Sequence, residues 1–149
     1  MKVKEVMETK VITIKDTATY EEAAAVLHNS RISGAPVVDK DGNVVGLISE
    51  KDLLRVLYPY YQSYAEHPEA YLDYEARENK IEEIRKRPID KFMTKQVTTI
   101  DPTTPVLKAG GIMLAHGFHR LPVIEDGKLI GIVTREHIYK GILKSHLGF

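Results

Sequence analysis

The feature that most constrains this chain is a repeat of its own sequence. Residues 11–57 lie over residues 97–142 with few adjustments: Pro36 matches Pro122 at an offset of 86, and Gly46 matches Gly131 at an offset of 85, because one residue is lost at a turn. At 149 residues, the chain has room for about one ordinary domain or a fused pair of small ones. The repeat therefore predicts one small unit formed twice.

Each copy contains the signature of a β-hairpin. The turns read DKDGN in the first copy and EDGK in the second, and both contain Asp-Gly between two apolar runs. Asp-Gly tolerates the positive φ angles of tight hairpin turns. We expect APVVD and VVGLIS to pair in the first copy, and LPVIE and LIGIVT to pair in the second.

Helical periodicity surrounds each hairpin. Apolar residues at three- and four-residue spacing predict a half-buried helix before it, EKDLLRVL or REHIYKGIL follows it as a second helix, and VITI or VTTI precedes the unit as a strand. The fold class is α/β in the broad α+β sense: two β-α-β-β-α repeats packed as a pseudo-twofold pair. The boundaries are 1–57 for the first repeat, 58–88 for a helical connector and 89–149 for the second repeat.

Two details of the second copy carry further expectations. Thr104 and Pro105 form a suitable N-cap and first-turn pair for the helix that follows. Gly110 and Gly111 fall inside that helix, where each glycine costs about 1 kcal/mol relative to alanine. We therefore expect them to allow close packing of one repeat's helix on the other's.

The connector differs in composition from both repeats, since six of the eight tyrosines of the chain lie within 58–88. A helix is predicted from Pro68 to Arg87. One interpretation is a connector helix docked on the repeats. The other is a partner or dimer surface, because exposed tyrosines suit interfaces.

Charge and composition exclude several classes of function. The formal net charge is +0, from 21 basic and 21 acidic residues, so no global field favours nucleic acid or an anionic membrane surface. There is no cysteine, the N-terminus MKVKEVMETKV is too polar for a signal peptide, and no apolar run approaches the roughly 18 residues of a membrane span. We expect a cytoplasmic protein without nucleic-acid or membrane partners.

The stretches SGAPVVDKDGNVVGLISEKDLL and HRLPVIEDGKLIGIVTREHI resemble a tandem pair of CBS domains, the family named after cystathionine β-synthase, which is also called a Bateman module. The resemblance implies binding of an adenine nucleotide or adenosyl compound in the cleft between the repeats, with a change of shape on binding. It also implies a regulatory rather than a catalytic protein that forms a homodimer. With no effector domain fused to either end, the effector is expected to be a separate chain.

The family pattern Gly-h-h-(Ser/Thr)-x-x-Asp places a hydroxyl near ligand phosphate and an aspartate at the ribose. Ser49 and Asp52 match it in the first copy. A carboxylate suits a ribose diol because its two oxygens can each accept a hydrogen bond. In the second copy Thr134 matches, but His137 replaces the aspartate and offers one acceptor at most. We therefore expect one competent site and one weaker site.

The phosphate side rests on a closer resemblance. HRLPVI resembles a stretch of the gamma subunit of the AMP-activated protein kinase, which implies that His119 and Arg120 reach phosphates at the site of Asp52. The first copy has Ser33 and Gly34 at these positions. The base is expected beside Val97, Thr98 and Thr99 at the competent site, and beside Val11, Ile12 and Thr13 at the weaker one.

Other interpretations of the same residues remain open. Asp52 can be an ordinary helix-start acid, and His119 and Arg120 can form a surface ion pair. His116 and His119 are three residues apart without a third ligand at suitable spacing, so no metal is expected. No catalytic motif and no catalytic cofactor are expected. AMP, ADP or ATP is the expected ligand; the alternatives are a sensor of S-adenosylmethionine or another adenosyl compound, and a ligand-free dimerisation scaffold.

Overall fold

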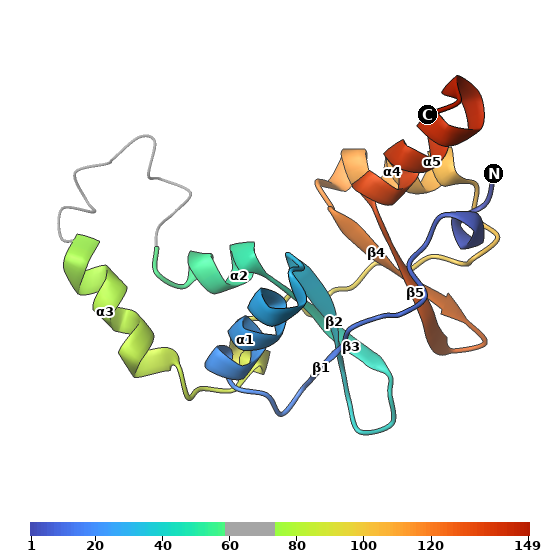
Figure 1. The fold of residues 1–149 in the computed structure, drawn as a ribbon. Coiled ribbons are helices and arrows are strands. Elements are labelled where there is room, and N and C mark those ends of the chain that lie inside the picture. Colours follow the sequence, from blue (N-terminus) through green and yellow to red (C-terminus); the bar gives the residue numbers. More distant parts are fainter. Residues whose placement is uncertain (59–73) are drawn as a thin grey trace. The chain divides into compact units, whose positions relative to one another are not determined.

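The computed structural model describes residues 1–58 and 74–149, with side chains for all of these except 74–77 (Figure 1). The chain forms two compact units. The first unit is Thr13–Gln96, and the second unit combines Met1–Ile12 with Val97–Phe149. None of the helices within the described residues is long and apolar enough to cross a membrane.

The first unit contains one complete β-α-β-β-α repeat. In its sheet, β1 runs parallel to β2, and β2 runs antiparallel to β3. Its elements are β1 (Ile14–Lys15), α1 (Tyr20–Ser30), β2 (Gly34–Val38), β3 (Val44–Ser49), α2 (Glu50–Arg55), α3 (Tyr74–Ile84) and the 3-10 turn η4 (Ile89–Lys91).

The second unit repeats this order with a smaller sheet. Its elements are the 3-10 turn η1 (Val3–Glu5), α4 (Val106–His116), β4 (Arg120–Glu125), β5 (Lys128–Thr134) and α5 (Arg135–Leu147). The predicted strand at 97–100 is reduced to a single parallel bridge between Ile100 and Val123. In the first unit the Asp16 N–H extends the ladder by donating to Val38 O at 2.9 Å. Its counterpart is Pro102, which has no N–H to donate.

Equivalent positions of the two repeats fill two separate apolar cores. Among the buried pairs, Ala23 corresponds to Ala109 and Val37 corresponds to Val123. Burial of this kind stabilises a domain by about 25 cal/mol per Å² of apolar surface. The two cores, built from equivalent residues, thus confirm the predicted repeat of one α+β unit.

The helix that follows Thr104 begins differently from the prediction. Pro105, with φ −59° and ψ 138°, occupies the N-cap position and offers no side-chain cap, so α4 begins at Val106. Thr104 instead donates its N–H to Asp101 O within a turn. The Val106 N–H, one of the donors that a helix start leaves without an intrahelical acceptor, is satisfied by Met1 O at 3.1 Å.

Each sheet is completed by the segment that precedes the other repeat in sequence. Thr94 and Leu47 exchange two backbone hydrogen bonds of 2.9 Å in the first unit, and Glu8 and Ile132 exchange two of 2.9 Å in the second. Val3 is completely buried in the core of the second unit. The boundaries 1–57, 58–88 and 89–149 remain a prediction from sequence. In the structure, residues 1–12 pack with the second unit and residues 13–96 form the first.

Two glycines make this arrangement possible. A Cβ atom at Gly46 would lie 2.6 Å from Met93 Sδ and 3.0 Å from Thr94 O, and one at Gly131 would lie 2.5 Å from Met7 Sδ. These distances are far below an ordinary van der Waals contact. Glycine is therefore required where β3 and β5 meet the incoming segment.

Replacing Gly46 by alanine should destabilise the protein by about 1–3 kcal/mol, because the added methyl group forces Met93 and the adjoining backbone to move. Gly111→Ala is the matched control, since nothing lies within 4 Å of its Cβ position in α4 and alanine favours a helix by about 1 kcal/mol. Urea unfolding measures the stability of both variants. Equal midpoints for Gly46→Ala and wild type would contradict the close contact.

Helix α3 is docked on the first unit at its C-terminal end. Ile84 is buried in the core, and the N–H groups of Tyr20 and Glu21 donate to Arg87 O at 2.8 Å and Arg85 O at 3.0 Å. The Glu21 carboxylate also binds Arg85 Nε at 2.6 Å. These contacts agree with the docked-connector interpretation for this part of the connector.

Within the described residues, the connector helix ends earlier than predicted. It ends at Ile84 rather than Arg87, because the residue before a proline, here Pro88, avoids the helical region. The rest of the predicted helix, and the tyrosines Tyr60, Tyr61, Tyr64 and Tyr71, lie outside the described residues.

The contact between α1 and the residues that directly follow α3 should make the stability of the protein sensitive to acid. Hydrogen bonds from Lys86 and then Arg85 lower the pKa of Glu21. A lowered pKa in the folded state adds stability above the unfolded-state pKa, and this stability is lost as the pH falls through the folded value. Glu21→Gln should therefore unfold at lower urea concentration than wild type at about pH 7, and the difference should shrink towards about pH 3.

Glu125→Gln, in the exposed hairpin of the second unit, is the control and should keep the acid response of wild type. A constant difference between Glu21→Gln and wild type across this pH range would show that the carboxylate does not stabilise the docked helix.

Candidate functional site

The first residues of α2 hold Asp52 in a capping box. Ser49 ends β3, and its Oγ accepts the Asp52 N–H at 3.3 Å. In return, Asp52 Oδ2 accepts the N–H of Ser49 at 2.9 Å and its hydroxyl at 3.0 Å. The box satisfies donors that a helix start leaves open, and the positive end of the helix dipole favours the carboxylate.

The other carboxylate oxygen of Asp52 faces two further side chains. Arg55 Nη1 lies 3.2 Å from Oδ1, and the Thr94 hydroxyl donates to it over 3.4 Å. Among residues 1–58 and 78–149, Asp52 alone is both charged and buried, with 6% of its surface exposed. A buried carboxylate is tolerated only when donors surround it. Ser49, Arg55 and Thr94 together hold the Asp52 carboxylate at this position.

Thr94 was not predicted as part of this cluster. It stands on the segment that precedes the second repeat in sequence, yet it packs in the first unit beside Leu47. The sequence does mark this segment, because a methionine recurs before each repeat, as Met7 and Met93, at the repeat offset of 86. The repeat pattern does not show which sheet the segment joins, so it could not place Thr94 beside Asp52.

The second unit contains the same capping box with histidine in place of aspartate. Thr134 Oγ1 accepts the His137 N–H at 3.2 Å, and His137 Nδ1 accepts the Thr134 N–H at 3.2 Å. The imidazole thus performs the capping role of the carboxylate through its one acceptor nitrogen. Helix α5 is capped, but the second acceptor that a vicinal diol needs is missing.

The predicted phosphate-side residues lie beside the capping hydroxyls of their own units. Arg120 opens β4 and pairs in register with Thr134, and Gly34 pairs with Ser49 in the first unit. His119 O accepts the Arg135 N–H at 3.2 Å, and Ser33 O accepts the Glu50 N–H at 2.9 Å. The role of His119 and Arg120 at Asp52 remains a prediction, because it joins residues of two units.

The predicted base-side residues precede Ile14 and Ile100 and belong to no helix or strand. Val11 and Val97 are partly buried, and the side chains of the remaining residues are exposed: Ile12, Thr13, Thr98 and Thr99. Their peptide groups lie where the chain passes from one unit to the other.

His116 and His119 are the two histidines whose spacing superficially resembles a metal site. His116 stacks on Phe118 with ring centroids 5.3 Å apart. In the part of the chain that the structure describes, no group of three His, Cys, Asp or Glu residues is placed to hold a metal ion.

Comparison with known proteins identifies the family. The model of the CBS domain matches residues 3–59 and 89–144. The chain therefore belongs to the CBS domain family and contains a tandem pair of these domains, as the sequence motifs predicted.

Relatives that align with most of this chain differ in length. An uncharacterized protein of Methanocaldococcus jannaschii is 30% identical over 93% of this chain, which spans 41% of that protein. The A-adding tRNA nucleotidyltransferase of Aquifex aeolicus is 28% identical over 95% of this chain, which spans only 14% of that enzyme. A CBS domain-containing protein of Dictyostelium discoideum is 31% identical, with 95% of this chain and 91% of that protein covered.

Two proteins similar in structure to this chain have been solved with adenosyl ligands. Arabidopsis thaliana CBSX2, solved in complex with AMP, has a TM-score of 0.74 and 26% identity, with 97% of each chain covered. The CBS domain pair of protein MJ0100, in complex with 5'-methylthioadenosine and S-adenosyl-L-methionine, has a TM-score of 0.71 and 25% identity, with 97% of this chain and 98% of that one covered. These similarities show the predicted fold class.

The role of His137 as a cap can be tested directly. Asp at position 137 would recreate the box of the first unit and add a negative charge at the helix start, so His137→Asp should stabilise the protein by about 0.5–1 kcal/mol. His137→Ala removes the acceptor and should destabilise it by about 0.5–2 kcal/mol. Thermal unfolding should thus rank Asp above His above Ala, and an unchanged melting temperature in both variants would refute the cap.

Proposed function

We propose that this chain is a regulatory module that binds AMP, ADP or ATP, with Ser49 and Asp52 of one repeat and His119 and Arg120 of the other as ligand-binding residues. The observation that carries the proposal is the difference between two otherwise equivalent capping boxes. A buried carboxylate surrounded by donors is costly to maintain for capping alone, and His137 shows that a neutral side chain can cap the same helix start.

Recognition of ribose is the chemistry that this carboxylate fits. Its Oδ2 is already positioned by Ser49, while Oδ1 receives only the longer contacts of 3.2 Å and 3.4 Å from Arg55 and Thr94. Each carboxylate oxygen has two acceptor sites. Two vicinal hydroxyls can therefore donate to a carboxylate whose direction the cap has fixed in advance.

The guanidinium of Arg120, which follows His119 in the sequence, favours a phosphorylated ligand. A guanidinium donates in pairs to phosphate oxygens, whereas the sulfonium of S-adenosylmethionine would be repelled by it. CBS domain pairs that are similar in structure include one with AMP bound and one with 5'-methylthioadenosine and S-adenosyl-L-methionine bound. An adenosyl ligand is common to both, and Arg120 supports the nucleotide over the sulfonium compound.

The second site, with Thr134 and His137 on one side and Ser33 and Gly34 on the other, is proposed to be weak. It has neither the second diol acceptor nor an arginine at the position of Arg120. We expect nucleotide to occupy one site per chain first. Binding at that site would bias the packing of the repeats, and a separate effector protein would detect the change. A homodimer in the cytoplasm is the proposed form.

The test is calorimetric titration of AMP, ADP, ATP and S-adenosylmethionine into wild type and three variants. Asp52→Asn keeps an oxygen for the cap but removes the charge, and should weaken AMP binding by about 10–100-fold. Arg120→Gln should weaken ATP more than S-adenosylmethionine. His137→Asn, the matched change in the other repeat, should leave the first binding event unchanged.

The possible outcomes separate the alternatives. Unchanged affinity in Asp52→Asn would exclude Asp52 as the ribose residue. Binding of S-adenosylmethionine alone would identify the adenosyl-compound sensor. Absence of binding by wild type to every ligand would favour the dimerisation scaffold.

A further inference from the structure

The Asp52 carboxylate already has a donor at each of its acceptor sites. A carboxylate offers about four such sites, two on each oxygen. Oδ2 accepts the N–H and the hydroxyl of Ser49 at 2.9 Å and 3.0 Å. Oδ1 faces Arg55 Nη1 at 3.2 Å and accepts the Thr94 hydroxyl at 3.4 Å. A hydroxyl of a ligand can therefore bind Asp52 only by taking the place of one of these donors.

The donors on Oδ2 belong to the capping box and cannot leave without opening it. The Ser49 N–H is part of the backbone, and the Ser49 hydroxyl also accepts the Asp52 N–H at 3.3 Å. The donors on Oδ1 are side chains that can turn away. The Thr94 hydroxyl can rotate about its bond, and the Arg55 side chain is 37% exposed. Exchange with a ligand is therefore expected at Oδ1.

Arg55 is the donor on Oδ1 whose departure costs more. A contact between a guanidinium and a carboxylate is charge-assisted, and such contacts are stronger than those of a neutral hydroxyl. The Asp52 side chain is only 5% exposed, and a buried charge that loses its partner destabilises the fold. A ligand hydroxyl that replaces Arg55 must offset this loss.

The second repeat shows that the direction of this cation depends on the carboxylate. Lys140 stands at the position of Arg55. Its Nζ lies 2.5 Å from Oε1 of Glu136, four residues earlier, whereas His137 is the residue three positions before it. Arg55 pairs instead with the residue three positions before it, which is Asp52. The cation is thus directed at the candidate ligand position in the repeat that has the carboxylate.

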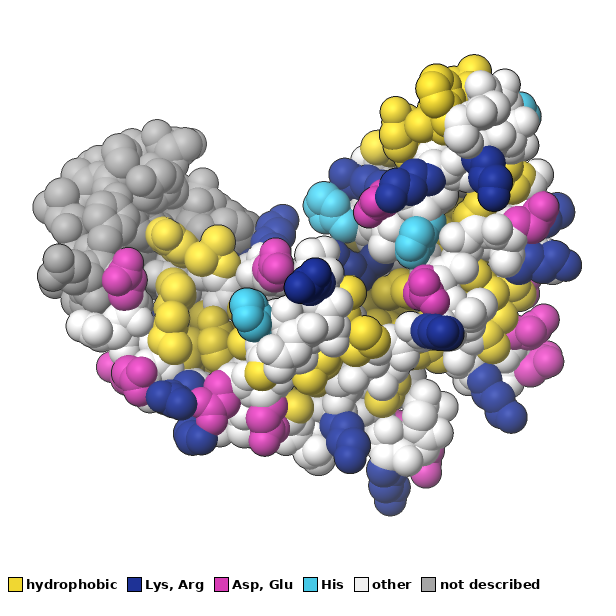
Figure 2. Space-filling model, in the orientation of Figure 1, with side chains coloured by type: hydrophobic (Ala, Val, Ile, Leu, Met, Phe, Trp, Pro, Cys, Tyr) yellow, Lys and Arg dark blue, Asp and Glu magenta, His cyan; other side chains and the backbone are white. Residues whose placement is uncertain are grey.

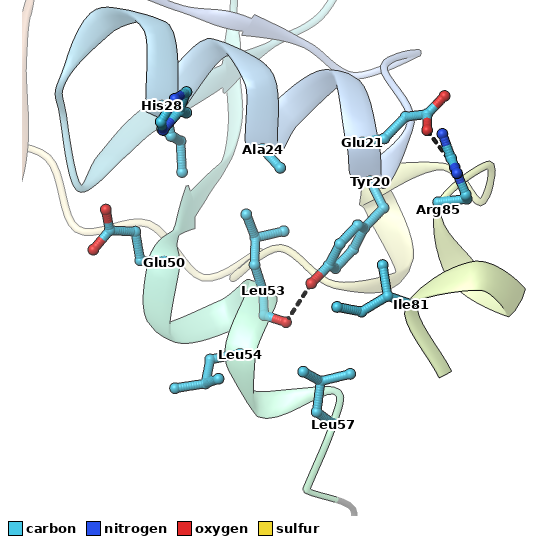
Figure 3. A pocket seen from close by; sticks show the side chains of 11 residues that line it. Tyr20, Glu21, Ala24, His28, Glu50, Leu53, Leu54, Leu57, Ile81 and Arg85 are labelled. Atoms are coloured by element: carbon cyan, nitrogen blue, oxygen red, sulfur yellow. Dashed lines mark hydrogen bonds and ion pairs between the residues drawn. The ribbon is translucent and has the colours of Figure 1, made fainter. Parts of the chain in front are cut away.

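The other side of α2 is anchored independently of Arg55. Leu53, Leu54 and Leu57 line a groove of about 590 Å³ between α2, α1 and α3 (Figure 3). Figure 2 shows apolar side chains gathered in this hollow. The Tyr20 hydroxyl donates to Leu53 O at 2.7 Å and ties α2 to α1 (Figure 3). We therefore expect Arg55 to leave Asp52 by a movement of its side chain, with α2 held in place.

We infer that the Arg55 guanidinium holds the place of a ligand hydroxyl on Asp52 Oδ1 and is displaced when ribose binds. The inference rests on the proposed function and adds the residue that sets the affinity and specificity of that site. A vicinal diol brings two donors, one for each side chain that leaves Oδ1. Arg55 therefore raises the ligand concentration needed for binding, and a complete ribose offsets this best.

Two other roles of Arg55 predict the opposite effect of its removal. If Arg55 donated to the ligand, a variant without the guanidinium would bind the ligand more weakly. If Arg55 only held Asp52 in position, the variant would also bind more weakly, because the ribose acceptor would be less well oriented. Tighter binding after removal is expected only for a residue that the ligand displaces.

The experiment measures calorimetric AMP binding and thermal unfolding of the full chain with Arg55→Met. The variant should bind AMP about 3–10-fold more tightly than wild type, because no ion pair has to be broken. Without ligand it should melt at a lower temperature, because Asp52 has lost its cation. Lys140→Met, at the equivalent position of α5, is the matched control and should leave the first binding event unchanged.

Two analogues of AMP show whether the gain belongs to a ribose hydroxyl. Each of 2'-deoxyAMP and 3'-deoxyAMP lacks one hydroxyl of the diol. The gain of Arg55→Met over wild type should be largest for AMP and should disappear for at least one analogue. An undiminished gain with both analogues would overturn the inference, because Arg55 would then act without being displaced by a hydroxyl.

The outcomes distinguish this inference from the proposed function. AMP binding by wild type, with equal or weaker binding by Arg55→Met, rejects the displacement of Arg55 and retains the nucleotide site. Absence of AMP binding by both proteins rejects the proposed function and the inference together. Circular dichroism checks that Arg55→Met is folded, and Arg55→Gln, which also lacks the charge, replaces it if it is not.

Discussion

The structure depends on the contact between a glycine in the last strand of each repeat and a methionine from the segment that precedes the other repeat. Met93 lies against Gly46, and Met7 lies against Gly131. Without a side chain on β3 and β5 at these points, the incoming backbone reaches the strand and forms its hydrogen bonds. The bridges that these segments add to both sheets, and the position of Thr94 beside Asp52, follow from this contact.

Much of the fold could be predicted because the repeat supplied each signal twice. The Asp-Gly turns placed both hairpins, and apolar spacing placed α1 and α4. The destinations of residues 1–12 and 88–96 could not be predicted, since each segment aligns with the repeat that follows it but packs on the other one. The reduced strand before α4 also depended on one backbone N–H, which Pro102 lacks.

The candidate site was predicted in part for a similar reason. Motif spacing located Ser49, Asp52, Thr134 and His137, and the structure shows that both pairs form capping boxes. Spacing could not show that His137 Nδ1 would take over the capping role, or that Thr94 would join Asp52, because both facts depend on side-chain geometry. The repeats have diverged at positions that leave the helix starts intact, which is how two copies of one fold can acquire different binding properties.

The packing of each repeat's preceding segment on the other repeat has a consequence for folding during synthesis. Val3 is synthesised before the whole of the first repeat, but it belongs to the same core as Val133 of the second repeat. The second unit cannot close until the second repeat has been synthesised, and its contacts join residues that are distant in the sequence. Folding is therefore expected to be dominated by late, long-range steps, which are slow because distant parts of the chain must first be brought together.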